Sequence, residues 1–154
     1  MTLGMSDIKL AWLAGFIDGD GSIQLVRSQN VLKPKVTIIN TNDTLLNECI
    51  RILKLLNGRE PYIYTQKSTS VKHKIRKQII ITKQSEIVHL LVSIYPHLVG
   101  KKEQAKLLMR FCTKIRNGYD EEDETITKDI QELNQRGDAK MTHTRINLKI
   151  GEAQ

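Results

Sequence analysis

Residues Leu13-Ala-Gly-Phe-Ile-Asp-Gly-Asp-Gly21 end an apolar segment with two carboxylates set among glycines. We predict a helix over Asp7–Gly19, because apolar residues without a breaker lead up to this point. Its central part, Leu10–Ile17, is apolar on every side, which is typical of a helix that is buried on all faces. Gly15 and Gly19 are four residues apart and share one face of this helix. We therefore expect the helix to pack against a partner as well as against its own core.

The two carboxylates of this segment stand where a helix disfavours negative charge. Asp18 and Asp20 come at the C-terminal end of the predicted helix, which is the negative end of its dipole. A bound cation would explain acids at this place, and Mg²⁺ takes one or two carboxylates together with water and phosphate. The alternative is a simple helix stop followed by an Asp-Gly turn. An EF-hand is excluded because the spacing of glycine and glutamate does not fit its loop.

A strand-strand-helix pattern follows this helix and then occurs a second time. The first unit has predicted strands at 22–28 and 35–40, a turn-like segment at 30–34, and a helix at 44–56. The second has strands at 61–67 and 72–82 around a polar turn at 68–70, and a helix at 85–95. Further helices are predicted at 102–116 and from residue 120 to a break at Gly137, and 141–150 is either a short strand or an ordered tail. The sequence thus predicts an α+β fold of order αββαββα with extra C-terminal helices.

Length, composition and charge exclude several classes of protein. The 154 residues suit one domain, 1–154, in which 119–154 form an acidic C-terminal helix and tail. No segment approaches the roughly 20 apolar residues of a membrane span, and the N-terminus lacks the pattern of a signal peptide. Two cysteines in helix-like patterns indicate buried thiols in a reducing compartment. We expect a soluble intracellular protein, in the cytoplasm or an organelle, that is neither secreted, membrane-bound nor a zinc finger.

Positive charge is concentrated in the first three quarters of the chain. Residues 1–119 hold 19 basic and 8 acidic side chains, a net +11, whereas residues 120–154 hold 5 and 9, a net −4. The whole chain carries +7, and its pI is near 9.5. A field of this sign favours a polyanionic partner such as nucleic acid.

One face of the predicted sheet carries long polar, basic and aromatic side chains. Alternation in each strand places the apolar residues on the other face, which an antiparallel sheet can bury. Such a face is either an ordinary solvated surface or a surface that reads base edges in a DNA major groove. On the second interpretation the DNA contacts are Ser22, Gln24, Val26, Ser28, Asn30, Lys33, Lys35, Thr37, Ile39, Tyr62, Tyr64, Gln66, Lys72, Lys74, Arg76 and Gln78.

The segment Leu13–Gly21, followed by Ser22-Ile23, resembles the signature helix of the LAGLIDADG homing endonucleases. Pro96-His-Leu98 and Lys101-Lys-Glu-Gln-Ala105 are similar to a second block of that family, ahead of a helix. The resemblance covers most of the chain up to about residue 118. It implies the homing-endonuclease fold, with an antiparallel sheet that binds DNA.

The resemblance also implies roles for individual residues. Asp20 matches the acid that binds the catalytic metal, with the carbonyl of Gly19 nearby, while we expect a structural role for Asp18 at the helix end. Lys101 matches the active-site lysine, and Lys102 is the alternative if the alignment shifts by one. Asn42 falls where many members have a glutamine that orients water. Some members carry a basic residue one turn after that glutamine, but here Leu46 stands at this position.

Members with one signature helix act as homodimers, which implies a homodimer here. The interface expected from the motif and the two glycines consists of Trp12, Leu13, Gly15, Phe16 and Gly19. The implied activity is divalent-metal-dependent hydrolysis of double-stranded DNA at a long pseudo-palindromic site in intron homing, leaving 3′ overhangs. Mg²⁺ or Mn²⁺ would support cleavage, and Ca²⁺ would support binding alone. No small-molecule cofactor is expected, because no phosphate-binding or dinucleotide motif is present.

Two other functional classes remain open. One is a non-catalytic nucleic-acid binder, such as an intron maturase or a transcription regulator. The other is a structural or protein-interaction module, which would not explain a one-sided basic sheet. Retention of Asp20 and Lys101 favours the enzyme, since a binder has no chemical need for them.

Overall fold

The computed structural model describes residues 5–67 and 74–136 of the chain. Its elements follow the predicted order αββαββα, with two more helices after it. They are α1 (Asp7–Asp20), β1 (Gly21–Ser28), β2 (Val31–Asn40), α2 (Asp43–Asn57), β3 (Tyr62–Gln66), β4 (Arg76–Ile81), α3 (Gln84–Ile94), the 3-10 turn η1 (Tyr95–His97), α4 (Lys102–Thr113) and α5 (Glu121–Arg136). The predicted turn at 68–70, Lys72, Gly137 and the segment 141–150 lie outside the described residues.

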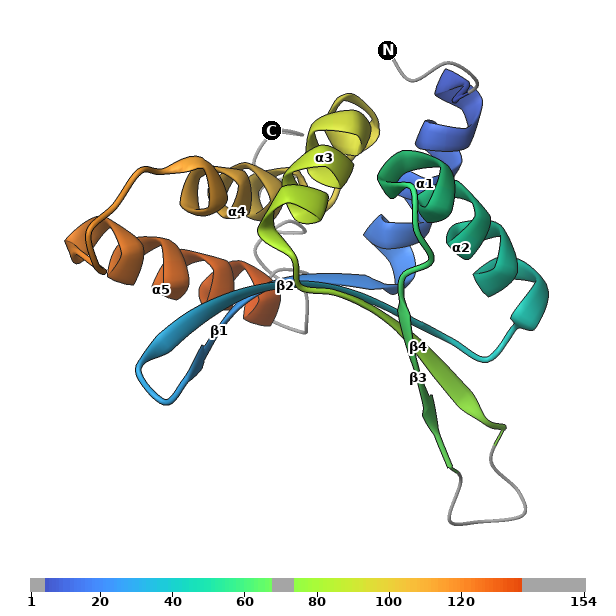
Figure 1. The fold of residues 1–154 in the computed structure, drawn as a ribbon, viewed down its shortest axis with the longest axis horizontal. Coiled ribbons are helices and arrows are strands. Elements are labelled where there is room, and N and C mark those ends of the chain that lie inside the picture. Colours follow the sequence, from blue (N-terminus) through green and yellow to red (C-terminus); the bar gives the residue numbers. More distant parts are fainter. Residues whose placement is uncertain (1–4, 68–73, 137–154) are drawn as a thin grey trace, which may run out of the picture.

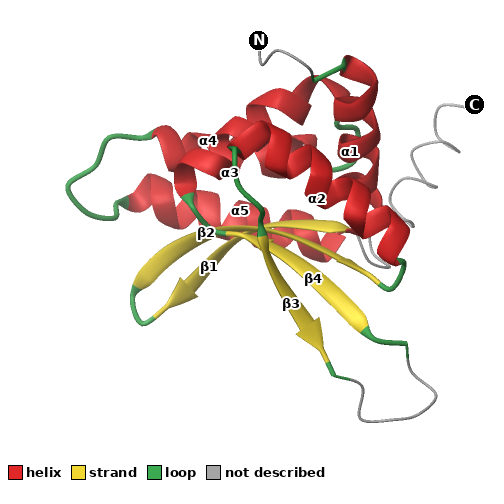
Figure 2. Cartoon of the chain, turned by 45° about the vertical axis from the view of Figure 1, so that its right-hand side comes forward, coloured by secondary structure: helices red, strands yellow, loops and turns green. Residues whose placement is uncertain are grey.

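The four strands form one antiparallel sheet in the order β1-β2-β4-β3. Figure 1 shows the sheet as an arch, with α1 to α4 on one side and the two hairpins curving away on the other. Figure 2 shows the same two layers after a 45° turn. The predicted α+β class and strand-helix order are confirmed, and the sheet keeps one broad face that the helices above it do not cover.

The core lies between the sheet and the helices because the buried apolar residues of the strands share the face that the helices cover. In the two central strands, Val36, Ile38 and Ile79 have no exposed surface. Helices α1, α2 and α3 supply the opposing layer through Leu13, Ala14, Ile17, Leu46, Cys49, Ile52, Leu53, Ile87, Leu90, Leu91 and Ile94. Cys49 and Cys112 are free thiols, and burial raises the pKa of Cys49 to about 12 and that of Cys112 to about 11.

The turn between β1 and β2 is tighter than the sequence pattern indicates. A turn-like segment at 30–34 is predicted, but the hairpin turns on Gln29 and Asn30 alone, both at positive φ (49° and 65°). Pro34 instead lies within β2, opposite Leu25. A proline is accommodated there because β4 pairs only with residues 36–40, so this part of β2 has a single neighbouring strand.

Helix α4 ends three residues earlier than predicted. The chain leaves the helix at Lys114, which has extended backbone angles (φ −70°, ψ 129°). Arg116 then turns back, and its guanidinium donates to the carbonyl of Phe111 at 2.6 Å while stacking on the Phe111 ring. Ile115, which the helical pattern would place inside, is 99% exposed as a result.

Helix α5 packs beside α4 and against the edge strand β1 (Figure 1). Asp120 and Asp123 accept each other's backbone N–H groups, at 3.0 and 3.1 Å, and so close the first turn of α5. At the other end of the helix, Asn134 donates to the main-chain carbonyl of Ile23 at 3.0 Å. The acidic helix thus covers part of one sheet edge. Among the described residues, no helix combines the length and apolarity needed to span a membrane.

Candidate active site and sheet surface

Helix α1 passes into β1 without an intervening loop, and Gly21 makes this junction possible. The N–H of Gly21 donates to the carbonyl of Ile17. A Cβ at position 21 would lie 2.7 Å from that carbonyl oxygen and 2.8 Å from the Ile17 Cα, distances that only glycine avoids. Asp20 is therefore fixed as the last residue of α1, exposed beside the first residue of the sheet.

The Asp20 carboxylate is held by a side chain from the end of β2. Asn40 Nδ2 donates to Asp20 Oδ2 at 2.8 Å, and Asn40 Oδ1 in turn accepts the backbone N–H of Asn42 at 2.7 Å. Within the part of the chain that the structure describes, Asp20 Oδ1 accepts no hydrogen bond. Asp20 thus presents one free oxygen from a fixed side chain.

Asn42, for which the resemblance implies a role in orienting water, is engaged at the start of α2. It is the N-cap of α2, where its Oδ1 accepts the N–H of Leu45 at 3.2 Å. Asparagine is favoured at such a position because it satisfies a helix N–H that has no partner within the helix. The structure thus gives Asn42 a capping role, and the asparagine that contacts Asp20 is Asn40.

Asp18 binds the segment that precedes α4. Its carboxylate accepts three successive backbone N–H groups, from Val99 at 2.8 Å, Gly100 at 3.1 Å and Lys101 at 2.9 Å. These hydrogen bonds join the end of α1 to the start of α4, residues that are more than 80 positions apart in the sequence. This agrees with the structural role expected for Asp18.

Lys101 and Lys102 have different surroundings. The ammonium of Lys101 donates to the main-chain carbonyl of Asp18 at 2.5 Å. Burial lowers the pKa of this ammonium below its ordinary value, against the opposing attraction of the Asp18 and Asp20 carboxylates. Lys102 lies over the Tyr95 ring, 5.1 Å from its centroid. Lys101 is therefore the lysine on the side of the two aspartates.

The described part of the chain offers too few ligands for a complete metal site. Among residues 5–67 and 74–136, no group of three or more His, Cys, Asp and Glu side chains could hold a metal ion. An exposed carboxylate with one open oxygen still fits Mg²⁺, which is commonly bound through one or two carboxylates with water and phosphate. Asp20 alone could supply one carboxylate oxygen to such an ion.

The outer side of α1 is open in the single chain. An added Cβ at Gly15 or at Gly19 would meet no atom within 4 Å, and the Trp12 and Phe16 rings stack beside them at 5.3 Å. Leu13 differs from the other predicted interface residues because it has no exposed surface and belongs to the chain's own core. The helix is therefore buried on one side only, and Leu13 is removed from the expected interface.

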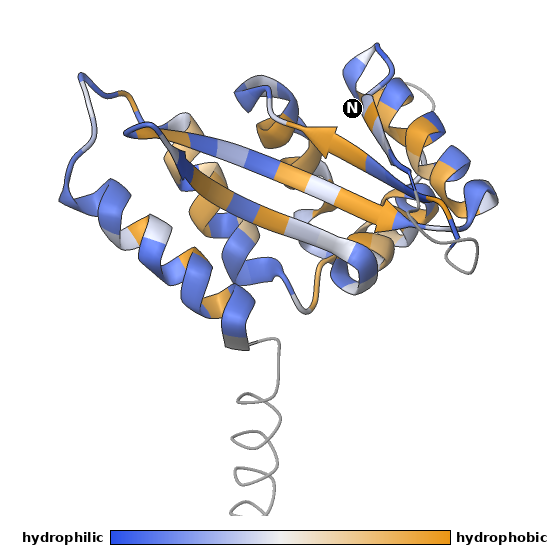
Figure 3. Cartoon of the chain, turned by 90° about the horizontal axis from the view of Figure 1, so that it is seen from below, coloured by the Kyte–Doolittle hydropathy of each residue, from blue (hydrophilic) through white to orange (hydrophobic). Residues whose placement is uncertain are grey.

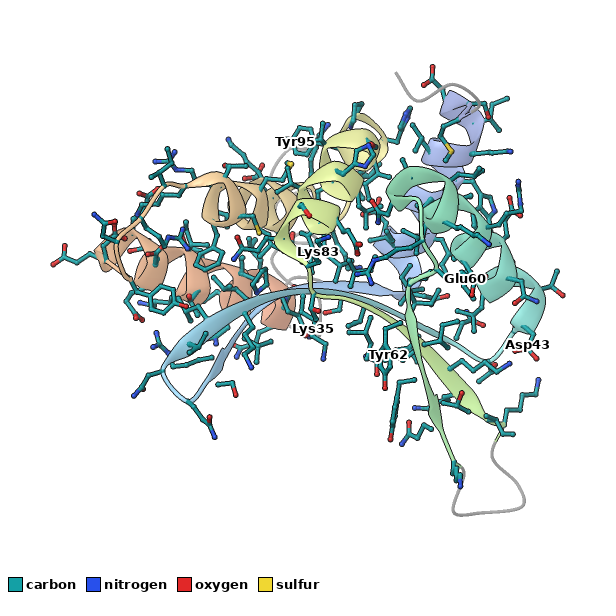
Figure 4. All side chains as sticks on the ribbon, viewed as in Figure 1. Lys35, Asp43, Glu60, Tyr62, Lys83 and Tyr95 are labelled. Carbon is teal, nitrogen blue, oxygen red and sulfur yellow. The ribbon has the colours of Figure 1, made fainter. Side chains whose placement is uncertain are left out.

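The uncovered face of the sheet gathers the predicted polar side chains from all four strands. The register aligns Ser22 with Thr37, Gln24 with Lys35, and Ile39 with Gln78 and Tyr64. Alternation then places Val26, Ser28, Lys33, Arg76, Tyr62 and Gln66 on the same side. Figure 3 views this face from below, and Figure 4 shows Lys35 and Tyr62 beneath the arch.

The structure removes Thr37 from this set and adds Val31 to it. Thr37 lies on the predicted face but is only 4% exposed at the sheet centre, so its side chain offers almost no surface to a ligand. Val31, opposite Ser28 and 45% exposed, joins the face because the hairpin turn is short. Lys74 is exposed just before β4, and Asn30 lies in the turn between β1 and β2.

Comparisons with known proteins agree with this architecture. Residues 7–95, more than half of the chain, match the family model described as LAGLIDADG-like domain. An uncharacterized protein of Methanocaldococcus jannaschii is 34% identical over 65 residues, which are 42% of this chain and 24% of that protein. The match thus spans about a quarter of that relative's length.

Solved structures of homing endonucleases share the fold. The homing endonuclease I-CvuI in complex with its target has a TM-score of 0.58 at 22% identity, over 86% of this chain and 84% of that one. The homing endonuclease I-TnaI has a TM-score of 0.56 at 20% identity, over 97% and 100% of the two chains. LAGLIDADG meganuclease I-AabMI bound to uncleaved DNA has a TM-score of 0.57 at 19% identity, over 79% and 43%.

Proposed function

The chain belongs to the LAGLIDADG family, and we propose from this and from its α1–β1 junction that it is a site-specific DNA homing endonuclease. The proposed reaction is divalent-metal-dependent hydrolysis of both DNA strands at a long pseudo-palindromic site, leaving 3′ overhangs. The observation that carries the proposal is the position of Asp20. It combines an exposed, fixed carboxylate, the open glycine face of α1 and the uncovered sheet at a single place.

A homodimer would complete this site. Two α1 helices that pack through Gly15 and Gly19 would bring both Asp20 side chains to the shared axis. The proposed contact surface consists of Trp12, Gly15, Phe16 and Gly19, without Leu13. A dimer doubles the formal charge of +7 to +14 and places two sheets on one duplex, which suits a site with two similar halves.

The divalent ion would be Mg²⁺ or Mn²⁺, held by Asp20 near the carbonyl of Gly19, with Ca²⁺ supporting binding alone. When bound, such an ion supplies charge stabilisation at the phosphate and an activated water. Lys101 is proposed to sit at the scissile phosphate, where its ammonium offsets negative charge. Its half-buried position and its bond to the Asp18 carbonyl hold it at the same helix end as Asp20.

The sheet is proposed to read the major groove. Lysine, arginine and glutamine can form paired hydrogen bonds with base edges, and the tyrosines add apolar surface. The sheet face is curved (Figure 1), and the register places these side chains on strands of both hairpins, where Tyr62 and Tyr64 are 65% and 49% exposed. The proposed contacts retain the predicted set except for Thr37, with Lys72 outside the described residues.

The test is cleavage of DNA that spans the uninterrupted insertion locus, in Mg²⁺, Ca²⁺ or EDTA. We expect double-strand cleavage in Mg²⁺ only. Asp20→Asn should abolish cleavage and leave binding in Ca²⁺ nearly intact. Asp7→Asn, the same substitution at the other end of α1, should cleave normally. Binding without cleavage in any divalent metal would instead support a maturase or a regulator.

A further inference from the structure

We infer that Asn40 is a positioning residue for the Asp20 carboxylate, an inference that rests on the proposed metal-binding role of Asp20. The sequence around Asn40 carries no signal of this role, because the residue stands at the end of a strand and has no charge. The structure brings it to Asp20 across 20 residues, with Asn40 Nδ2 at 2.8 Å from Asp20 Oδ2.

The Asn40 amide has a defined orientation. Its Oδ1 accepts the backbone N–H of Asn42 at 2.7 Å, so the oxygen must face the β2–α2 corner. The amide nitrogen then points to Asp20, since the two groups are on opposite sides of the same planar amide. Asn42 is itself fixed as the N-cap of α2, through the N–H of Leu45. A continuous set of hydrogen bonds therefore connects the start of α2 with the carboxylate.

This arrangement affects what Asp20 can offer to an ion. Oδ2 is engaged, and among residues 5–67 and 74–136 no donor reaches Oδ1, so the carboxylate would bind through Oδ1 in a fixed direction. The donor is neutral, and it holds the charged carboxylate without cancelling the charge that attracts a cation. Partners of this kind orient metal ligands, and their removal typically weakens metal binding about 10- to 100-fold.

The alternative is that the hydrogen bond between Asn40 and Asp20 serves only the stability of the fold. Asn40 pairs with Lys77 in the β2–β4 ladder, so its backbone contributes to the sheet whatever its side chain does. A purely structural side chain would change the unfolding midpoint when removed and would leave metal binding as it is. The two roles are therefore separated by measuring metal affinity and stability on the same variants.

The experiment is a titration of the 154-residue chain, bound to a duplex that spans the insertion locus, with Mn²⁺, followed by electron paramagnetic resonance, and the duplex alone gives the baseline. The variants are Asn40→Leu, which keeps the size without polar atoms, and Asn40→Ser, whose shorter side chain cannot span the distance to Asp20. Asn47→Leu, at an exposed asparagine of α2, is the matched control. Asp20→Asn establishes how much of the Mn²⁺ uptake belongs to Asp20. Unfolding midpoints identify which variants fold.

We expect the Mn²⁺ dissociation constant to rise about tenfold or more in both Asn40 variants and to stay at the wild-type value in Asn47→Leu. If Asp20→Asn loses Mn²⁺ while folded Asn40→Leu and Asn40→Ser keep the wild-type constant, the inference about Asn40 is wrong and the proposed function stands. If Asp20→Asn binds Mn²⁺ as the wild type does, the metal role of Asp20 fails, and the inference fails with it.

Discussion

Asp18 and Lys101 are joined to each other twice, once in each direction. The Asp18 carboxylate accepts the backbone N–H of Lys101 at 2.9 Å, and the Lys101 ammonium donates to the main-chain carbonyl of Asp18 at 2.5 Å. One residue lies in the last turn of α1 and the other directly precedes α4. The pair therefore fixes the proposed active-site lysine to the helix that carries Asp20.

Replacement of Asp18 should loosen this connection. Asp18→Ala leaves the N–H groups of Val99, Gly100 and Lys101 without their acceptor, and we expect a decrease of about 1–3 kcal/mol in the free energy of unfolding. Urea denaturation measures it. Asp43→Ala, which removes an exposed ion pair with Lys77, should cost less than about 1 kcal/mol. Equal decreases in the two variants would contradict the role of Asp18.

Lys101→Met should separate catalysis from stability. We expect cleavage to fall at least about 100-fold, as when a positioned catalytic group is removed. The folded state should lose little stability, because burial already disfavours the charged ammonium and lowers its pKa. Lys102→Met, which removes the ammonium from above the Tyr95 ring, is the control and should cleave normally. The reverse pattern in a cleavage assay would identify Lys102 as the active-site lysine.

Much of this fold is visible in local sequence signals. Alternation fixes which side of β1 and β2 is buried, because side chains in a strand point to opposite faces in turn. Asn57-Gly58 marks the end of α2, and Gly58 indeed has the left-handed conformation (φ 73°) that favours glycine. The signature segment identifies Asp20 and Gly21, whose roles depend on neighbours within a few residues.

The remaining features depend on contacts that no sequence pattern signals. Asn40 and Asn42 are chemically alike, and only the geometry of the β2–α2 corner decides which one caps the helix and which one reaches Asp20. Thr37 has the alternation of a surface residue but is covered at the sheet centre. The early end of α4 follows from Arg116, which binds the Phe111 carbonyl and Asp123. Neither strand alternation nor helical periodicity indicates these contacts.

Lys35 on the uncovered sheet face should contribute to DNA affinity through charge. Lys35→Ala should weaken binding and make the plot of log affinity against log salt shallower by about one for each phosphate that the protein no longer neutralises. Fluorescence anisotropy on a nonspecific duplex, between about 50 and 200 mM salt, measures this. Lys106→Ala, which removes the same charge from the exposed side of α4, should leave the slope as it is. Identical slopes for all three proteins would argue against the sheet as the DNA surface.

Lowering the pH should weaken the attachment of α5 because Asp120 becomes protonated. A hydrogen bond from Lys114 lowers the pKa of Asp120 from 3.8 to about 2, with a smaller effect from the N–H of Asp123. A carboxyl whose pKa is lower in the folded state stabilises the fold at pH values above its pKa in the unfolded state. This contribution disappears as the pH falls through its pKa in the folded state. We expect the unfolding midpoint of the wild type to drop between about pH 4 and pH 2, and that of Asp120→Asn to drop less. If the unfolding midpoints of the wild type and Asp120→Asn fall in parallel as the pH is lowered, the stabilising role of Asp120 is contradicted.

Gly15→Leu should separate folding from assembly. An added Cβ meets nothing within 4 Å in the single chain, and leucine favours a helix over glycine by about 0.8–1 kcal/mol. We therefore expect each chain to fold at least as stably as the wild type but to sediment as a monomer, because the side chain blocks close approach of two α1 helices. DNA cleavage should disappear as well, since each copy supplies one Asp20. Asn47→Leu controls for the added apolar surface and should remain dimeric. A Gly15→Leu protein that sediments and cleaves as the wild type does would show that the proposed dimer does not form through this face of α1.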